Sequence, residues 1–506
     1  MERLTFNIGS SRGGPLVVAG RALARETASK TPKPARSPFA GATRRVAAVR
    51  ERYDWDYLWM LAFTTLLFLR PQDHLPGLEP LHLAELAAIA GLAAMVVRRL
   101  SSGQTITRVN AEVIGVIALG AVLVLTMPFS IWPGGSMTVF SEIYVKIILI
   151  FALMMSTITS PRRVRQMTWI MIIASGYIAS RAVFDYLRGE NLVEGDRVRG
   201  AIGGMFENPN DLALNLVTFL APTLFIICQE KKASRRLFAG AIAATMVAAI
   251  VCTKSRSGFL GLIGMGAVVF YYLSKVKPAL VVGVLLAGLM ALPALPSSFW
   301  DRMDSIVNAD EDQSGSRAAR LRLIDQGVDV FLENPLTGIG AGQFRNYNSP
   351  GVVEKWRVTH NVWLQVATEL GVFGLLTFAF LVLRAYSSSF AALRMLGRSK
   401  TRVLRNADRG LRMAHPPSNP ESAERDPQFE LSADERNILE INAKGMIAAM
   451  VGWTICAFFA SVAFNWTFYY VFALAVAGRE IIASRRIAAE PAPTTVPAPR
   501  LVRATA

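Results

Sequence analysis

Cysteine and histidine are both scarce in this chain. Its 506 residues include three cysteines and four histidines. The cysteines are Cys228, Cys252 and Cys456, all within or at the ends of apolar runs, and they show neither metal-site spacing nor a disulfide framework. We interpret them as small core residues and predict no metal and no cofactor.

We also predict no cleavable signal peptide. The first ~50 residues are basic, contain proline and serine, and lack an apolar core. This composition is typical of a disordered tail, either solvated or in contact with anionic lipid. We expect membrane insertion to use the first apolar span instead.

Long apolar runs are abundant. Hydrophobic residues make up 52% of the chain, and its mean hydropathy is +0.35. Runs of about 18 residues or more, enough to cross ~30 Å of hydrocarbon, recur throughout. We predict an all-α fold, a polytopic membrane helix bundle of about 12 transmembrane helices with a partly helical extracytoplasmic loop over the bundle. The predicted spans are 56–70, 81–97, 110–127, 139–159, 166–187, 211–229, 236–253, 257–274, 278–295, 361–384, 443–464 and 466–483.

The net charge of +17 predicts orientation rather than a nucleic-acid partner, because the basic residues cluster beside apolar runs. They fall in every second short loop, at Arg98, Arg99 and Arg108; Arg162, Arg163 and Arg165; Lys231, Lys232, Arg235 and Arg236; and Lys275 and Lys277. Both termini are therefore predicted to face the cytoplasm, and loops 188–210 and 296–360 to face outward.

This orientation gives a predicted order of segments along the chain. They are a basic tail over 1–55, spans 1–9 over 56–295, a large periplasmic loop over 296–360, span 10 over 361–384, a cytoplasmic loop over 385–442, spans 11–12 over 443–483 and a tail over 484–506. The 385–442 loop is basic, then acidic, and contains Pro416, Pro417 and Pro420, so we interpret it as partly disordered.

The outward loop 296–360 contains a helical pattern. Apolar side chains recur at helical spacing at Leu321, Ile324, Val328 and Phe331. They predict an amphipathic helix on the membrane surface or against the bundle. The helix should end at Asn334-Pro335, because a residue before proline is pushed out of the α region. Gly338, Gly340 and Gly342 then favour a tight turn.

His360 and Arg256 are candidate site residues by position and chemistry. His360 lies where the outward loop meets a span, and a neutral imidazole with a pKa near ~6.5 can accept a proton from an attacking hydroxyl. Arg256 lies in a very short turn between two spans, either snorkelling to the surface or binding an anion through its guanidinium fork. Arg317 and Arg320 are neighbours on one face of the predicted loop helix.

Other charged residues are weaker candidates for a functional site. Arg188, Arg197 and Arg199 either extend an anion-binding surface or belong to a solvated loop. The i,i+4 pairs Glu142–Lys146 and Arg181–Asp185 are predicted to be structural. The turn Glu207–Asp211 should cap a span. The D-x-D sequences at 54–56 and 310–312 lack supporting ligands, so no metal site is predicted.

These residues resemble the bacterial O-antigen ligases and the related O-antigen polymerases. The motif H-N-x9-G-x-x-G is matched by His360, Asn361, Gly371 and Gly374; R-x3-L after serine by Ser255, Arg256 and Leu260; and R-L-x-L…N-P-L-x-G-I-G from Arg320 through Asn334, Pro335, Leu336, Gly338 and Gly340. The resemblance covers about residues 200–384. Ile324 stands where family members often carry an aromatic, which leaves open whether Arg317 or Arg320 is the family's loop arginine; we favour Arg320.

The resemblance implies a metal-independent, inverting glycosyltransferase of the bacterial inner membrane. Its donor would be an undecaprenyl-diphosphate-linked glycan and its acceptor the lipid A–core oligosaccharide or another glycan, on the periplasmic face. Arg256 and Arg320 would hold the diphosphate and His360 would act as the base. Arg317, Asn361, Arg197 and Arg199 are the expected substrate-binding residues.

Two alternatives stay open. A polymerase of the same superfamily must bind the same lipid-diphosphate donor, so the sequence barely separates it from a ligase. A polysaccharide transporter or flippase is the alternative of another class. We see no internal repeat of the kind such transporters carry.

Overall fold

The computed structural model describes residues 54–73, 77, 79–193, 196–201, 205–279, 297–304, 316–347, 358–412 and 431–487, with single positions between 282 and 293. The side chains at 73, 79, 298, 302, 316–319, 398–412 and 486–487 lie outside this description. So do the tail over 1–53, most of the predicted span 278–295 and the acidic sequence at 310–312.

The described residues are helical apart from one short hairpin and the connecting turns. The helices are α2 Trp55–Leu69, α3 Leu83–Ser101, α4 Ala111–Thr126, α5 Pro133–Thr138, α6 Val145–Thr157, α7 Pro161–Arg188, α8 Pro209–Gln229, α9 Ala233–Thr253, α10 Arg256–Ser274, α12 Ser297–Asp304, α13 Ser316–Glu333, α14 Val362–Arg412, α15 Ala433–Ala457 and α16 Trp466–Ile487. Strand β1, Leu192–Val193, pairs antiparallel with β2, Arg197–Val198.

Eight of the described helical segments are long and apolar enough to cross a membrane. They are α4 with its following turn, Pro133–Thr157, α7, α8, α9, α10, α14 as far as Gly397, and α15. Helix α2 is a shorter apolar helix. The chain is therefore a polytopic helical membrane protein, and every predicted span other than 278–295 overlaps a described helix.

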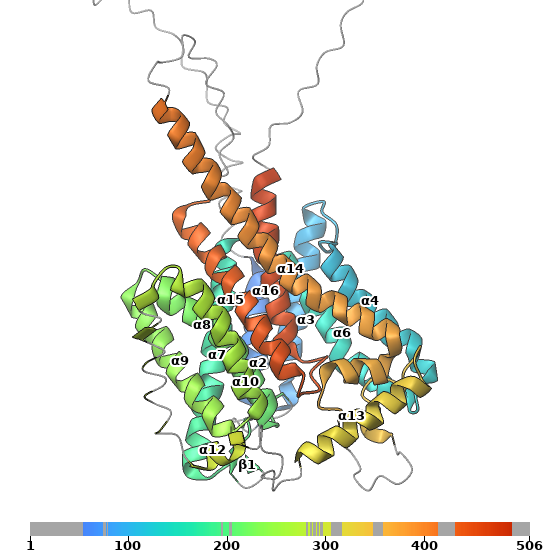
Figure 1. The fold of residues 1–506 in the computed structure, drawn as a ribbon. Coiled ribbons are helices and arrows are strands. Elements are labelled where there is room, and N and C mark those ends of the chain that lie inside the picture. The colour runs from blue at the N-terminus through green and yellow to red at the C-terminus, as the bar shows by residue number, and fades with distance from the viewer. Residues whose placement is uncertain are drawn as a thin grey trace, which may run out of the picture. The chain divides into compact units, whose positions relative to one another are not determined.

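Helices α15 and α16 lie between α8–α10 on one side and α4 and α6 on the other (Figure 1). Helices α8 and α15 are the most enclosed spans, with 83% and 72% of their apolar windows buried within the protein. Helix α15 also approaches α10, at Gly261, and α8, at Gly452, closely. A Cβ at Gly261 would lie 2.3 Å from the Cys456 sulfur and one at Gly452 2.7 Å from Val217. Small residues of this kind allow helix backbones to approach in membranes.

Two element boundaries differ from the sequence prediction. Helix α14 continues to Arg412, so the first part of the predicted 385–442 loop is helical. The buried residues Ala385, Ala392 and Leu396 keep the helical period there. Helix α15 begins at Ala433 and ends at Ala457, whereas span 11 was predicted over 443–464. Its start is a capping box at Ser432 and Glu435, a sequence signal that we overlooked.

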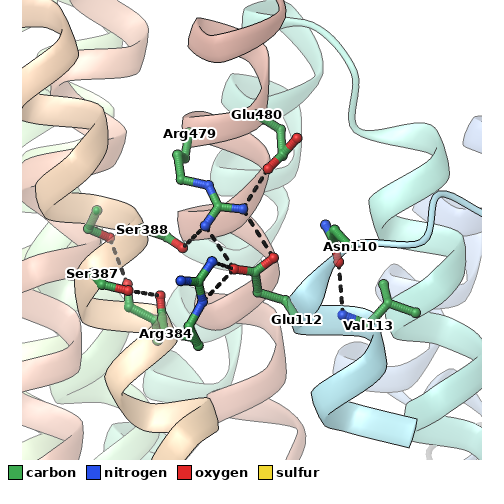
Figure 2. A network of polar contacts seen from close by, with 10 residues as sticks. Asn110, Glu112, Val113, Arg384, Ser387, Ser388, Arg479 and Glu480 are labelled. Atoms are coloured by element: carbon green, nitrogen blue, oxygen red, sulfur yellow. Dashed lines mark hydrogen bonds and ion pairs between the residues drawn. The ribbon is translucent and has the colours of Figure 1, made fainter.

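A buried carboxylate joins three helices that are distant in the sequence. Glu112, at the start of α4, is fully buried. Arg479 of α16 donates to both of its oxygens, at 2.7 and 3.0 Å, and Arg384 of α14 donates through Nε at 2.8 Å (Figure 2). Arg479 also reaches the Ser388 hydroxyl at 3.1 Å and the Glu480 carboxylate at 2.5 Å. The network ties α4, α14 and α16 together.

The predicted structural pairs within spans are confirmed. Lys146 bonds Glu142 at 3.2 Å, and Arg181 lies 3.4 Å from Asp185. The predicted cap of α8 is confirmed as well. The Asn208 side chain accepts a hydrogen bond from the backbone N–H of Asn210 at 2.9 Å.

The Glu112 network predicts a stability difference between two glutamate substitutions. Glu112→Gln leaves two guanidinium groups without a buried counter-charge, and we expect a loss of about 3–5 kcal/mol of folding free energy. The matched control is Glu190→Gln, which removes an exposed pair with Arg188 at 3.9 Å and should cost less than about 1 kcal/mol. Thermal unfolding in detergent measures both variants. Equal shifts would show that the network carries no special stability.

Candidate active site

His360 lies at the point where α14 begins. The next residue, Asn361, caps the helix, because its side-chain oxygen accepts hydrogen bonds from the N–H groups of Trp363 at 2.9 Å and Leu364 at 3.1 Å. His360 itself is half-buried and has a left-handed backbone conformation, with φ 48°. This conformation is uncommon for a residue other than glycine, and it fixes the direction in which the chain enters the helix.

Helix α14 is interrupted at Gly371. This residue has φ 65° and ψ −164°, a combination that only glycine adopts readily. The interruption frees two backbone carbonyls of the preceding turn. The Thr368 carbonyl accepts a hydrogen bond from the Ile339 N–H at 2.9 Å, and the Glu369 carbonyl from the Gly340 N–H at 3.0 Å. The loop that follows α13 is thus bonded directly to the broken helix.

The glycines of this loop allow the close approach. Gly338, Gly340 and Gly342 all have positive φ, at 63°, 104° and 72°, so the predicted tight turn is confirmed. A Cβ at Gly338 would lie 2.4 Å from the backbone of Glu369, and one at Gly371 2.4 Å from the Leu336 carbonyl oxygen. Two motifs that are separate in the sequence therefore form one interlocked unit.

Helix α13 ends at Glu333, immediately before Asn334-Pro335, as predicted. Its protein-facing residues are Leu323, Gly327 and Val330, which are buried. A Cβ at Gly327 would meet the Leu364 side chain at 2.5 Å, so α13 crosses the first turn of α14. The prediction of the helix is confirmed, but the apolar residues from which it was made lie on another face: Leu321, Ile324 and Val328 are exposed and Phe331 is half-buried.

Arg320 shares the protein-facing side of α13. It lies three residues before Leu323 and seven before Gly327, and it is half-buried. Arg317 is in the first turn of the same helix, and its side chain lies outside the described residues. At the other end of α13, Tyr347 donates a hydrogen bond to Glu333 at 3.0 Å. Burial and this hydrogen bond raise the pKa of Tyr347 above its usual range.

Arg256 is the first residue of α10 and is half-buried. The turn between α9 and α10 consists of only Lys254 and Ser255, as the sequence suggested. Ser255 caps α10 by accepting a hydrogen bond from the Gly258 N–H at 3.2 Å. Lys254 is 2% exposed, has φ 47° and forms an ion pair with Asp196. Buried lysines are rare, and we did not single this one out from the sequence.

A buried arginine supports this turn. Arg197, which is 3% exposed, donates to the Thr253 carbonyl at 3.1 Å and to the Asn210 side-chain oxygen at 2.9 Å. The same Asn210 oxygen accepts a hydrogen bond from the Ser255 hydroxyl at 2.7 Å. The solvated-loop interpretation is therefore wrong for Arg197, whereas Arg199 is exposed on the segment after β2.

The turn between α15 and α16, residues 458–465, connects the two candidate regions. On one side, the Thr359 hydroxyl is 2.9 Å from that of Ser461, directly beside the histidine. On the other, the Cys456 thiol at the end of α15 donates to the Ser257 carbonyl at 3.3 Å, one residue after the arginine of α10. The starts of α10 and α14 therefore lie at the same end of the bundle, which we call the His360 end.

Acidic residues do not cluster in the described part of the chain in a way that could hold a metal ion. No group of three or more His, Cys, Asp or Glu side chains converges among those residues. Asp56, from the first D-x-D sequence, forms an ion pair with Arg98 at 2.7 Å.

The fold is that of a multi-spanning helical membrane protein, and the candidate residues Arg256, Arg320 and His360 lie at one end of its bundle. Residues 216–379 match the family described as O-antigen ligase. This confirms the resemblance inferred from the motifs. The match includes Arg256, Arg320 and His360, whereas Arg197 and Arg199 lie before it. The family implies glycan transfer of the ligase or polymerase type on lipid-linked substrates. No curated protein matches the chain.

The close contact between the 334–342 loop and α14 at Gly371 predicts that adding one methyl group there lowers the stability of the fold. The alanine in Gly371→Ala must adopt a backbone conformation that costs residues other than glycine about 1–3 kcal/mol. Its Cβ would also clash with the Leu336 carbonyl oxygen. We expect a loss of more than about 2 kcal/mol in folding free energy and faster proteolysis of the 334–343 loop. Gly266→Ala is the control, because a Cβ there meets nothing within 4 Å. If both variants unfold at the wild-type temperature, the interlock does not contribute to stability.

Proposed function

We propose that this protein is an O-antigen ligase-like membrane glycosyltransferase. It moves a glycan from undecaprenyl diphosphate to an acceptor hydroxyl, such as one on the lipid A–core oligosaccharide. The observation that carries the proposal is the placement of the complete histidine motif: His360 lies just before α14, and the break at Gly371 of the same motif lets the 334–342 loop bond to the Thr368 and Glu369 carbonyls of that helix. This unit lies within the segment that matches the O-antigen ligases.

The reaction is a displacement at the anomeric carbon. His360 takes the proton from the acceptor hydroxyl, whose oxygen forms the new bond to that carbon while the bond to the diphosphate oxygen breaks. A single in-line displacement inverts the anomeric configuration. General-base catalysis of this kind contributes about 10²–10⁴-fold in rate.

The leaving group is a lipid diphosphate, so fixed positive charge stabilises the charge that develops on it. Arg256 and Arg320 are assigned to this task because guanidinium groups remain ionised and bind phosphate oxygens in pairs. The sugar–diphosphate bond is already activated and these cations replace a metal, so the transferase is metal-independent. Arg317, on the same helix as Arg320, is assigned to donor binding.

The remaining residues position or bind substrates. Arg197 fixes the turn that carries Arg256 through its bonds to Thr253 and Asn210, and it extends the positive charge toward the exposed Arg199. Asn361 uses its side-chain oxygen to cap α14. Among the described residues its amide nitrogen donates no hydrogen bond, which supports a contact with the substrate.

A groove beside Lys254 supports a lipid-borne donor. It measures about 610 Å³ and is lined mainly by apolar residues of α9, with Tyr186 and Phe299. A polyprenyl chain needs such an apolar surface next to the charged site that holds its diphosphate.

The charge pattern supports the orientation. The opposite end of the bundle carries the clusters around Arg98, Arg162, Lys231 and Lys275, which the positive-inside rule assigns to the cytoplasm. We therefore place the protein in the bacterial inner membrane, with both termini cytoplasmic and the His360 end periplasmic.

Purified variants test the assigned residues. Transfer from an undecaprenyl-diphosphate glycan should fall about 10²–10⁴-fold in His360→Ala and about 10²–10³-fold in Arg256→Ala and Arg320→Ala. Arg317→Ala should have a smaller effect, which separates the two loop arginines. Arg162→Gln, at the other end of the bundle, is the control and should keep wild-type activity. The assignment fails if the three variants transfer glycan at the wild-type rate while remaining folded.

The family match is shared by ligases and polymerases, and lipid profiles of a deletion strain separate them. We expect the acceptor to lose all added glycan chains while undecaprenyl-linked glycan accumulates. A polymerase would instead leave one repeat unit attached to the acceptor. The second outcome would replace the ligase assignment with the polymerase of the same superfamily.

A further inference from the structure

A polar cavity lies at the end of the bundle opposite His360. It has a volume of about 310 Å³ and is enclosed by the first turns of α7, the end of α8 and the first turns of α15. Helix α8 begins beside Arg197, at the His360 end, and ends here. The cavity is therefore separated from the candidate active site by the length of a span.

The cavity has more positive than negative charge. Four cations line it, Arg165, Lys231, Lys232 and Arg235, with two carboxylates, Glu230 and Asp434. Both carboxylates are already paired: Asp434 with Lys231 at 2.6 Å and Glu230 with Arg235 at 3.4 Å. Asp434 also interacts electrostatically with Arg165. Four cations and two carboxylates leave the lining with two more positive than negative charges.

A buried hydrogen-bond acceptor also lines the cavity. Asn442 is 2% exposed, and its side-chain nitrogen donates to the Leu474 carbonyl at 2.9 Å. Its side-chain oxygen has no hydrogen-bond partner in the described part of the chain. Leaving a buried acceptor unpaired is unfavourable, so the position fits a ligand that brings a hydroxyl donor.

The rest of the lining includes the polar Thr168 and Asn437 and an apolar part with Ile226, Ile438 and Ile441. Trp169 also borders the cavity and stacks on Phe238, at 6.1 Å between ring centroids. Tryptophan is enriched where a membrane protein meets the lipid headgroups. The cavity therefore combines an excess of positive charge, a buried acceptor without a partner and an apolar wall that includes a tryptophan.

We propose that this cavity binds an anionic glycerophospholipid with a hydroxyl-bearing headgroup, such as phosphatidylglycerol. Its phosphate lies against Arg165 and Lys232, its headgroup hydroxyl donates to Asn442, and its acyl chains leave along the apolar wall. Basic pockets between spans on the cytoplasmic side recognise anionic lipids in this way. Phosphatidylethanolamine is disfavoured because its ammonium group adds positive charge to a lining that already has an excess of it.

Native mass spectrometry of the full chain, purified in a neutral detergent, tests this site. The protein is titrated in turn with short-chain phosphatidylglycerol, phosphatidylethanolamine and inorganic phosphate. We expect saturable binding of phosphatidylglycerol at least 10-fold tighter than that of phosphatidylethanolamine, with no displacement by millimolar phosphate. The double variant R165Q/K232Q should weaken phosphatidylglycerol binding about 10- to 30-fold.

Two further variants complete the test. R162Q/K275Q removes the same number of exposed cations at the same end of the bundle, outside the cavity lining, and should bind as wild type. N442L, checked for folding by thermal unfolding, should weaken phosphatidylglycerol binding and reduce its preference over phosphatidylethanolamine. Equal affinity for the two lipids, wild-type affinity in R165Q/K232Q, or full displacement by inorganic phosphate would each overturn the proposal, the last by identifying a soluble anion as the ligand.

Discussion

The hydrogen bonds between the 334–342 loop and the broken helix α14 are the interaction on which the His360 end depends. A helix that breaks within a membrane-embedded bundle exposes carbonyls that neither water nor lipid can satisfy there. In this protein the Ile339 and Gly340 N–H groups satisfy those of Thr368 and Glu369. Because the loop continues directly from α13, the same bonds fix Arg320 relative to the helix that begins at His360.

Buried charged side chains have different kinds of contact at the two ends of the bundle. At the Glu112 end of α4, a buried carboxylate receives two arginines from distant helices, so the charges satisfy one another. At the His360 end, the buried Arg197 donates hydrogen bonds to oxygens of Thr253 and Asn210, so it joins the hairpin to the end of α9 and the start of α8.

Local signals allowed part of the site to be predicted. Asn334-Pro335 ends α13, Asn208 begins α8, and the glycines of the loop have the left-handed conformations expected of a tight turn. Each depends on neighbouring residues alone. The buried face of α13 was not predictable in this way, because its apolar residues occupy two faces and only contact with Leu364 decides which one is covered. The hydrogen bonds of Asn210 with Arg197 and Ser255, and the burial of Lys254, were not predicted for the same reason.

The amino-acid sequence by itself determined the class of protein, most of its membrane spans and the similarity of its central segment to the O-antigen ligases. Span length, charge alternation and short motifs are properties of contiguous segments, so no long-range contact is needed to recognise them. Only the tertiary structure decided that Glu112 pairs with Arg384 and Arg479, and that the loop motif bonds to the histidine motif across Gly371. Those pairings depend on how helices distant in the chain pack against one another, which hydropathy and local spacing do not specify.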